Sequence, residues 1–379
     1  MIYLNNAATT WPKPDIVANS VYNCICNIPQ EEERYGRVFD SVKSVSWARN
    51  KVKEFFNIQN SNNIVFNSGA TEGINSILFG LDIKDCHILT SVTEHNSVLR
   101  PLYMLSSNNK ITFIDCDDFG FIDINSIEKK ILHNTKILIM SIASNVSGAI
   151  QDFDKIYNNC IKNSIIPIFD ASQAGGCVVL DIGKYNKAFW VFAGHKSLFG
   201  ISGSGFIYIP DNIELKLYKT GGTGGLSELK KMPKRLPLRY EAGTKNIPGI
   251  ISIGSGIEFI QNIGIKNIES KKQKLLKILF DELSQNSNVK IYSAPADKNA
   301  GVFSFSMDNY TSEDLSDILY ESFEIITRSG LHCSPEIHKK FGTFENGLVR
   351  LSLSWFNEVG EISQLISAVN KISGVKMND

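Results

Sequence analysis

The sequence predicts an α/β protein with a large, mainly parallel sheet and a smaller α+β part. Up to about residue 255, short apolar runs alternate with amphipathic stretches, as in parallel sheets whose strands are joined by helices. The pattern then changes to one long charged amphipathic helix over 268–283, short strands and a terminal helix. The predicted strands are 63–69, 86–92, 110–116, 135–142, 165–170, 188–194 and 204–210 in the large sheet, and 289–294, 301–307 and 348–354 in the smaller part.

The 379-residue chain is long enough for two domains, because chains beyond about 250–300 residues usually divide into more than one core. Its 39 basic residues balance 39 acidic ones, which argues against a dedicated nucleic-acid or membrane-surface binder. No stretch approaches the roughly 18 consecutive apolar residues of a membrane span, and the first residues do not follow a signal-peptide pattern. We therefore expect a cytoplasmic protein in which the seven scattered cysteines are reduced.

Lys196 and Asp170 give the first indication of chemistry. Lys196 lies between an apolar strand and a glycine-rich turn, directly after His195. Asp170 follows the apolar run 165–169, which delivers its carboxylate to the end of a buried strand. Pyridoxal phosphate needs a lysine to bond its aldehyde and an acid to keep its pyridine nitrogen protonated, so that the ring can accept electrons. The two residues together therefore suggest this cofactor.

Other polar residues also follow predicted strands, where the ligands of open α/β sheets bind. The turn at 67–75 precedes a helix and can offer backbone N–H groups to a phosphate, although such turns are more often plain helix caps. His95 can stack on a planar ring or carry a proton, while a lone histidine is more often structural. The candidates of this kind are Gly69, Ala70, Thr71, His95, Asn145, Gln173, His195 and Thr244.

The sequence does not indicate a metal site. Cys24 and Cys26 are closer together than common zinc ligand pairs and have no second pair nearby. A site built from His332, Cys333 and His338 would lack its fourth ligand. We expect no metal cofactor.

Nine segments, taken in order, carry a family resemblance: 3–14, 68–75, 94–98, 144–148, 170–176, 194–205, 239–246, 326–335 and 348–357. Together they resemble the cysteine desulfurase and selenocysteine lyase branch of the class V aminotransferases, which are pyridoxal-phosphate enzymes of fold type I. The sequence TRSGLHCSP at 327–335 is similar to the type II subgroup. The resemblance implies a large cofactor-binding domain over 15–255, a small domain made of 256–379 with 1–14, and a homodimer with active sites at the interface.

The resemblance also implies a role for each matching residue. Lys196 would bond the cofactor, His95 would stack on its ring, and Asp170 would face its pyridine nitrogen. Arg350 would bind the substrate carboxylate, for which a guanidinium gives two matched hydrogen bonds. Gln173 would contact the phenolic oxygen of the cofactor. The phosphate would be held within the subunit by Ala70, Thr71 and His195, and from the other protomer by Thr244. The substrate side would be lined by Asn6, Ala7, Ala8, Asn145 and Arg328.

Cys333 decides the reaction that the resemblance implies. Its thiolate would attack the sulfur of L-cysteine, leaving L-alanine and a persulfide that passes to an acceptor protein or small thiol. The neighbouring Arg328 and His332 are expected to supply positive charge that favours the thiolate. L-selenocysteine is an alternative substrate, because its weaker carbon–selenium bond needs less help from Cys333. The residues do not choose between sulfur and selenium.

Two more distant alternatives remain open: another class V lyase, epimerase or aminotransferase, and a catalytically idle scaffold that keeps the fold.

Three positions depart from the pattern of the family. Ala193 stands where a serine commonly binds the phosphate, so one donor is missing and the cofactor affinity is expected to be lower. Asn5 replaces a common aspartate, and Leu331 replaces a residue that is often polar. None of these changes removes a catalytic group.

Overall fold

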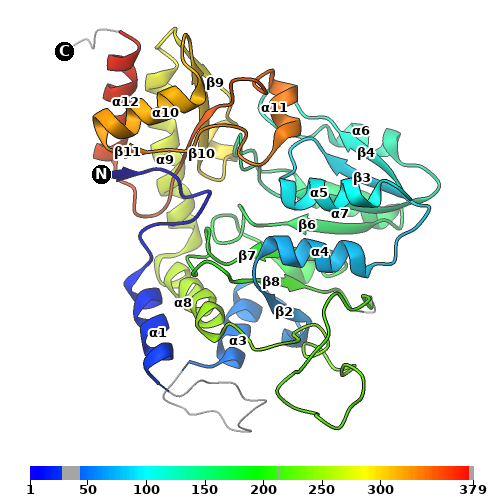
Figure 1. Ribbon diagram of the computed structural model, residues 1–379. Helices are drawn as coiled ribbons and strands as arrows, with labels where there is room; N and C mark the ends of the chain where they lie inside the picture. Colours follow the sequence, from blue (N-terminus) through cyan, green and yellow to red (C-terminus); the bar gives the residue numbers. More distant parts are fainter. Residues whose placement is uncertain (28–42, 212, 375–379) are drawn as a thin grey trace.

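The structure is a computed structural model that describes residues 1–27, 43–211 and 213–374. Within these residues, seven strands form one large sheet in the order β2-β8-β7-β6-β5-β3-β4 (Figure 1). β8 pairs antiparallel with both of its neighbours, and the other neighbouring strands are parallel. The predicted α/β fold class is confirmed. The strands are β2 (Ile64–Asn67), β3 (His87–Ser91), β4 (Lys110–Ile114), β5 (Thr135–Ser141), β6 (Ile166–Asp170), β7 (Phe189–Ala193) and β8 (Gly205–Tyr208).

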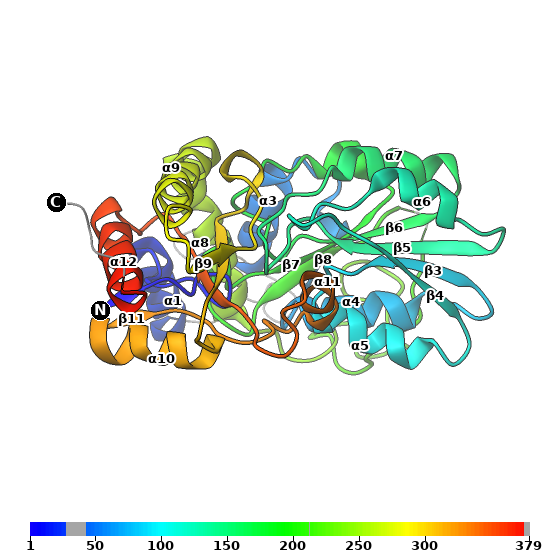
Figure 2. The same cartoon turned by 90° about the horizontal axis from the view of Figure 1, so that it is seen from above.

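Helices cover both faces of this sheet, which explains why most of its strand residues are buried (Figure 2). Successive side chains of β7 point to opposite faces. Phe189 and Val191 join the core that includes α4 and α5. Trp190 and Phe192 join the core that includes α3, α7 and α8. The helices of this part are α3 (Val45–Phe55), α4 (Ala70–Gly80), α5 (Asn96–Leu105), α6 (Ile124–Lys130), α7 (Phe153–Lys162) and α8 (Ile247–Ile263).

The smaller part of the described chain has its own core around a three-stranded antiparallel sheet, in the order β12-β10-β9. The first residues of the chain belong here, because β1 pairs in parallel with β11 and Ile2 lies in the same core. Figure 1 accordingly shows the amino terminus beside β11 and α12. The elements are β1 (Ile2–Tyr3), α9 (Ile265–Leu283), β9 (Val289–Ile291), β10 (Val302–Met307), α10 (Ser312–Phe323), β11 (Ile325–Ile326), α11 (Pro335–Phe341), β12 (Val349–Ser352) and α12 (Val359–Ile372). The first helix, α1 (Asp15–Cys26), instead packs against α8, and its Cys24 lies in the core of the large part.

Each of the ten predicted strand segments contains an observed strand. The long helix begins at Ile265, three residues before its predicted start, because Gly264 with φ of 87° separates it from α8. The division of the chain into 15–255 and 256–379 with 1–14 stays a prediction, and α8 continues past residue 255 as far as Ile263. Among the described helices, none is long and apolar enough to cross a bilayer.

The carboxyl ends of the parallel strands meet at one edge of the large sheet. Ser141, the last residue of β5, is the register partner of Asp170, the last residue of β6. The amino-terminal segment crosses this edge: the backbone N–H of Thr10 donates to the carbonyl of His195, and the N–H of Ala7 donates to Oγ of Ser352. Residues from both ends of the chain are thereby brought to the strand ends that carry the predicted site.

Candidate active site

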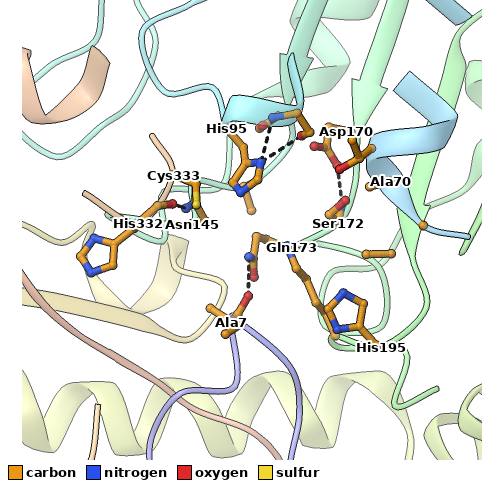
Figure 3. A pocket seen from close by; sticks show the side chains of 18 of the residues that line it. Ala7, Ala70, His95, Asn145, Asp170, Ser172, Gln173, His195, His332 and Cys333 are labelled. Atoms are coloured by element: carbon orange, nitrogen blue, oxygen red, sulfur yellow. Dashed lines mark hydrogen bonds between the residues drawn. The ribbon is translucent and has the colours of Figure 1, made fainter. Parts of the chain in front are cut away.

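A cavity of about 410 Å³ lies at the carboxyl ends of the parallel strands (Figure 3). It is lined by loops from the large sheet and, across the opening, by residues of the smaller part. Most of the predicted site residues meet here. These are Ala7, Ala8, Ala70, Thr71, His95, Asn145, Asp170, Gln173, His195, Lys196, Arg328, Cys333 and Arg350.

Two predicted residues are placed elsewhere. The side-chain amide of Asn6 donates to the carbonyl of Ser352 at 2.9 Å and accepts from the backbone of Trp11 at 3.1 Å. Asn6 therefore holds the amino-terminal segment in place and does not line the cavity. Thr244 lines a second cavity, of about 140 Å³, which shares Ser68 and Glu72 with the first.

Asp170 and Lys196 are positioned by neighbouring strands, β6 and β7. Asp170 is 5% exposed, and its Oδ1 accepts from the backbone N–H of Ser172 at 2.9 Å. Burial lowers the pKa of Lys196, the nearby charge of Arg350 lowers it further, and the carboxylate of Asp170 partly opposes the shift. A lysine with a lowered pKa has a larger share of the neutral amine, which is the nucleophile that bonds an aldehyde.

Three buried polar atoms around this cavity have no hydrogen-bond partner among the described residues. They are Oγ of Ser172, Nδ1 of His195 and Nε of Arg350. All three residues line the cavity. Buried polar groups are rarely left unpaired, so these atoms fit polar groups of a ligand. Together with Lys196 and Asp170, they fit the aldehyde, pyridine nitrogen and phosphate of pyridoxal phosphate and the carboxylate of an amino acid.

The amino terminus of α4 contributes the backbone N–H groups of a phosphate site. Residues 68–72 line the cavity, and α4 begins at Ala70. Gly69 has φ of 143°, which only glycine adopts easily. Its Cα lies 2.6 Å from the place that a Cβ on Gly205 of β8 would occupy. Glycine is therefore needed at Gly205 so that β8 can pass beneath this turn. The unpaired N–H groups and the dipole of the helix favour an anion.

His95 ends the loop after β3 and caps α5. Its Nδ1 accepts from the backbone N–H of Ser97 at 3.0 Å, which places the proton of the neutral ring on Nε2. Burial and the charge of Lys196 lower the pKa of His95 to about 4, although Asp170 opposes the shift. The imidazole is therefore neutral at pH 7, as suits a ring that stacks on a cofactor and donates or accepts a proton at Nε2.

Arg350 brings a buried positive charge to the substrate side. It lies in β12, is 4% exposed, and donates to the carbonyl of Asn145 and to Oδ1 of Asn5, both at 3.1 Å. In the described ranges of the chain, no carboxylate forms an ion pair with it. Burial and the charge of Arg328 lower its pKa to about 10, so the guanidinium stays charged at neutral pH. A buried cation without an ionic partner fits the carboxylate of a ligand.

Cys333 is exposed and lies in the loop between β11 and α11, beside the opening of the cavity. The expectation that His332 supplies positive charge to this thiol is wrong. The His332 ring points away from Cys333 (Figure 3), and its two nitrogens face the carbonyl of Arg328 at 3.1 Å and Nε2 of His338 at 3.3 Å. Burial lowers the pKa of His332 well below its ordinary value, so the ring is neutral. Of the expected pair, only Arg328 can supply charge.

Two amides that were expected to face the ligand also hold protein segments. Nε2 of Gln173 donates to the carbonyl of Ala7 at 3.0 Å, which leaves its Oε1 for a ligand. Nδ2 of Asn145 donates to the carbonyl of His332 at 2.7 Å. Sequence reasoning missed Ser172, whose signals were its position two residues after Asp170 and its place in the segment 170–176. It also missed Ser334, whose hydroxyl donates to Oδ1 of Asn145 at 2.8 Å. Ser334 lies in the segment 326–335 that carries the family resemblance, but no role was assigned to it there.

Comparison with known proteins gives one consistent result. A cysteine desulfurase from Wigglesworthia glossinidia brevipalpis is 30% identical, over 98% of this chain and 92% of that protein. A probable cysteine desulfurase from Borreliella burgdorferi is 31% identical over the same shares of the two chains. The apo structure of a cysteine desulfurase from Thermococcus onnurineus NA1 is similar with a TM-score of 0.89 at 28% identity, covering 98% of this chain and 94% of that one. The profile of the family described as Aminotransferase class-V matches residues 2–365, and the chain belongs to this pyridoxal-phosphate-dependent family.

Proposed function

We propose that this protein is a pyridoxal-phosphate-dependent L-cysteine desulfurase that forms L-alanine and a persulfide on Cys333. The observation that carries the proposal is the convergence of Lys196, Asp170, Arg350 and Cys333 on one cavity. The names of the similar proteins point to the same activity. They do not favour the selenocysteine alternative, since each of them is named for cysteine.

Residues of the large sheet would hold the cofactor. Lys196 would bond its aldehyde, Asp170 would pair with its ring nitrogen, and His95 would stack on the ring. The N–H groups at the start of α4 would hold its phosphate, together with Nδ1 of His195, which has no partner among the described residues. When bound, the cofactor withdraws electrons from the amino acid attached to it, which weakens the bonds at the α- and β-carbons.

The protein's own side chains then position the substrate and move its protons. Arg350 would bind the carboxylate, since its Nε has no partner in the part of the chain that the structure describes. Lys196 would be the base that removes the α-proton of the substrate, because burial lowers its pKa and so favours the neutral amine. The Sγ thiolate of Cys333 attacks the substrate sulfur. A sulfur–sulfur bond forms and the carbon–sulfur bond breaks with its electron pair going to carbon. The β-carbon takes a proton, and Lys196 would return a proton to the α-carbon, which gives alanine. An acceptor thiol then receives the terminal sulfur.

We also propose that the active enzyme is a homodimer. Thr244 lines the neighbouring cavity and not that of its own Lys196, which fits a residue that serves the phosphate of a second subunit. Mixed dimers provide the test. Subunits carrying Lys196→Ala are combined with subunits carrying Thr244→Ala. If Thr244 acts across the interface, the site that keeps Lys196 receives an intact Thr244 from the Lys196→Ala subunit, so one site of each mixed dimer is complete. If Thr244 acts within its own subunit, neither site is complete. Activity no higher than that of the two parent variants would contradict the proposal.

The decisive test of the activity uses the purified protein with bound cofactor and L-cysteine. We expect equal amounts of alanine and sulfide in the presence of a reducing thiol. Without the thiol, we expect a persulfide on Cys333 that mass spectrometry detects as one added sulfur atom. Cys333→Ser should retain the cofactor absorbance and the spectral change on adding L-cysteine, while it loses alanine formation. Undiminished alanine formation by Cys333→Ser would contradict the persulfide mechanism.

A further inference from the structure

Three consecutive residues around the proposed nucleophile are hydrogen-bonded to the carboxyl edge of the large sheet. Nδ2 of Asn145 donates to the carbonyl of His332 at 2.7 Å. The backbone N–H of Asn96, the first residue of α5, donates to the carbonyl of Cys333 at 2.7 Å. The hydroxyl of Ser334 donates to Oδ1 of Asn145 at 2.8 Å. The amide of Asn145 thus bonds the residue before Cys333 and the residue after it.

This part of the loop has a backbone conformation that needs support. His332 and Cys333 have φ values of 51° and 58°, so two consecutive residues with side chains lie in the left-handed region. Such residues persist only when the surrounding structure holds them. The side chain of His332 gives part of this support through Arg328 and His338. Further support comes from the bonds to Asn145 and Asn96 and from the backbone N–H of Ser334, which donates to the carbonyl of Leu331 at 2.8 Å.

The support from Asn145 is buried and requires both groups of an amide. Ser334 is 0% exposed and Asn145 is 6% exposed. A carboxylate at position 145 would keep the acceptor for Ser334 but lose the donor to His332. The backbone carbonyl of Asn145 also accepts from Nη1 of Arg350 at 3.1 Å. One residue therefore connects the proposed carboxylate-binding guanidinium to the loop that carries the thiol.

We propose that Asn145 and Ser334 are positioning residues that hold the Cys333 thiol in line with the substrate sulfur. This inference rests on the proposed function, because it concerns the step in which Cys333 attacks the substrate. Loading of the cofactor and attachment of the substrate precede that attack and do not use the thiol. Small misplacements of a nucleophile reduce rates strongly, so loosening the loop slows this single step.

Ser334→Ala is the sharpest variant, because Ser334 does not line the cavity and its substitution leaves the ligand contacts unchanged. We expect wild-type cofactor absorbance and a wild-type spectral response to L-cysteine. Persulfide formation on Cys333 in a single turnover should fall roughly tenfold or more, in keeping with the loss of one buried hydrogen bond. Hydrogen exchange in the peptide covering 331–337 should become faster. Ser147→Ala is the matched control, because Ser147 is equally buried and, among the described residues, its hydroxyl bonds only within its own turn, where it accepts from the backbone N–H of Ala149.

If Ser334→Ala folds poorly, a second variant tests the same inference. Asn145→Ala removes the bonds to His332 and to Ser334. The double variant, Asn145→Ala with Ser334→Ala, should lose no more persulfide formation than Asn145→Ala alone, because Ser334 acts through its contact with Asn145. Fully additive losses would overturn the inference. A wild-type persulfide rate in Ser334→Ala, or a loss that merely follows lost cofactor absorbance, would overturn it as well.

These outcomes are distinct from failure of the proposed function. If the wild-type protein forms neither alanine nor persulfide, the proposed function fails. Hydrogen exchange around Cys333 in Ser334→Ala still reports whether the contact holds the loop. Faster exchange would support that contact, and unchanged exchange would overturn it.

Discussion

Replacing Arg350 with alanine tests the substrate side of the site. The structure gives Arg350 two donors to protein oxygens at 3.1 Å and leaves Nε without a partner. Because the guanidinium is buried and has no carboxylate partner in the described ranges, a bound substrate carboxylate supplies its ionic partner. Loss of such a buried charged pair costs about 2–4 kcal/mol. At about 1.4 kcal/mol for each factor of ten, KM for L-cysteine should rise by roughly 30- to 700-fold.

The assay is a titration with L-cysteine that follows alanine formation and the absorbance of the bound cofactor. Cofactor content should be unchanged, because Arg350 lies on the substrate side of the cavity. Thermal unfolding is measured in parallel, since the carbonyl of Asn145 and Oδ1 of Asn5 lose a donor in this variant. Arg328→Ala is the matched control: its guanidinium is exposed, so the effect of removing it should be smaller, up to about 1 kcal/mol. A KM within threefold of wild type for Arg350→Ala would refute the assignment.

Three further predictions follow from other parts of the site. Lys196→Ala should abolish turnover and shift the cofactor absorbance to that of the free aldehyde, and normal turnover would overturn its assignment. Burial raises the pKa of Glu94 to about 8, so the folded protein keeps a proton on Glu94 that the unfolded chain releases above its ordinary pKa of 4.5. The contribution of Glu94 to the free energy of unfolding is therefore complete below pH 4.5 and is lost as the pH rises through 8. Glu94→Gln should therefore flatten the decline of the free energy of unfolding between pH 4.5 and 8, by up to about 1.4 kcal/mol per pH unit, as measured by urea titration. An unchanged slope would show that Glu94 is ionised in the folded protein. Gly205→Ala should weaken cofactor binding in a titration of the apo protein, because the new Cβ would lie 2.6 Å from Cα of Gly69. In the control variant Gly222→Ala, the new Cβ meets no described atom within 4 Å, so this variant should bind the cofactor normally. Equal cofactor affinity in both glycine variants would contradict this account of the phosphate turn.

The strands and the residues at their ends were predictable because both signals are local. An apolar run such as 188–194 is recognisable from its own residues, and in a parallel sheet its carboxyl end must meet those of its neighbours. Lys196 and Asp170 follow adjacent strands, so their convergence required little beyond the predicted sheet. Cys333 was found only through the motif that surrounds it. Its loop belongs to the smaller part, and the hydrophobic pattern of that loop does not indicate that Cys333 faces the cavity.

The sequence by itself determined the fold class, the position of the parallel sheet and the chemical groups at its edge, because strand period and residue type are properties of short segments. Only the tertiary structure decided the partners of those groups. Asn145 and His332 are 187 residues apart in sequence, and Asn6 and Ser352 are 346 apart. Which of the available donors and acceptors meet depends on how the smaller part packs across the sheet edge. That packing turns His332 away from the thiol, holds Asn6 outside the cavity and gives Asn145 its bonds to the Cys333 loop.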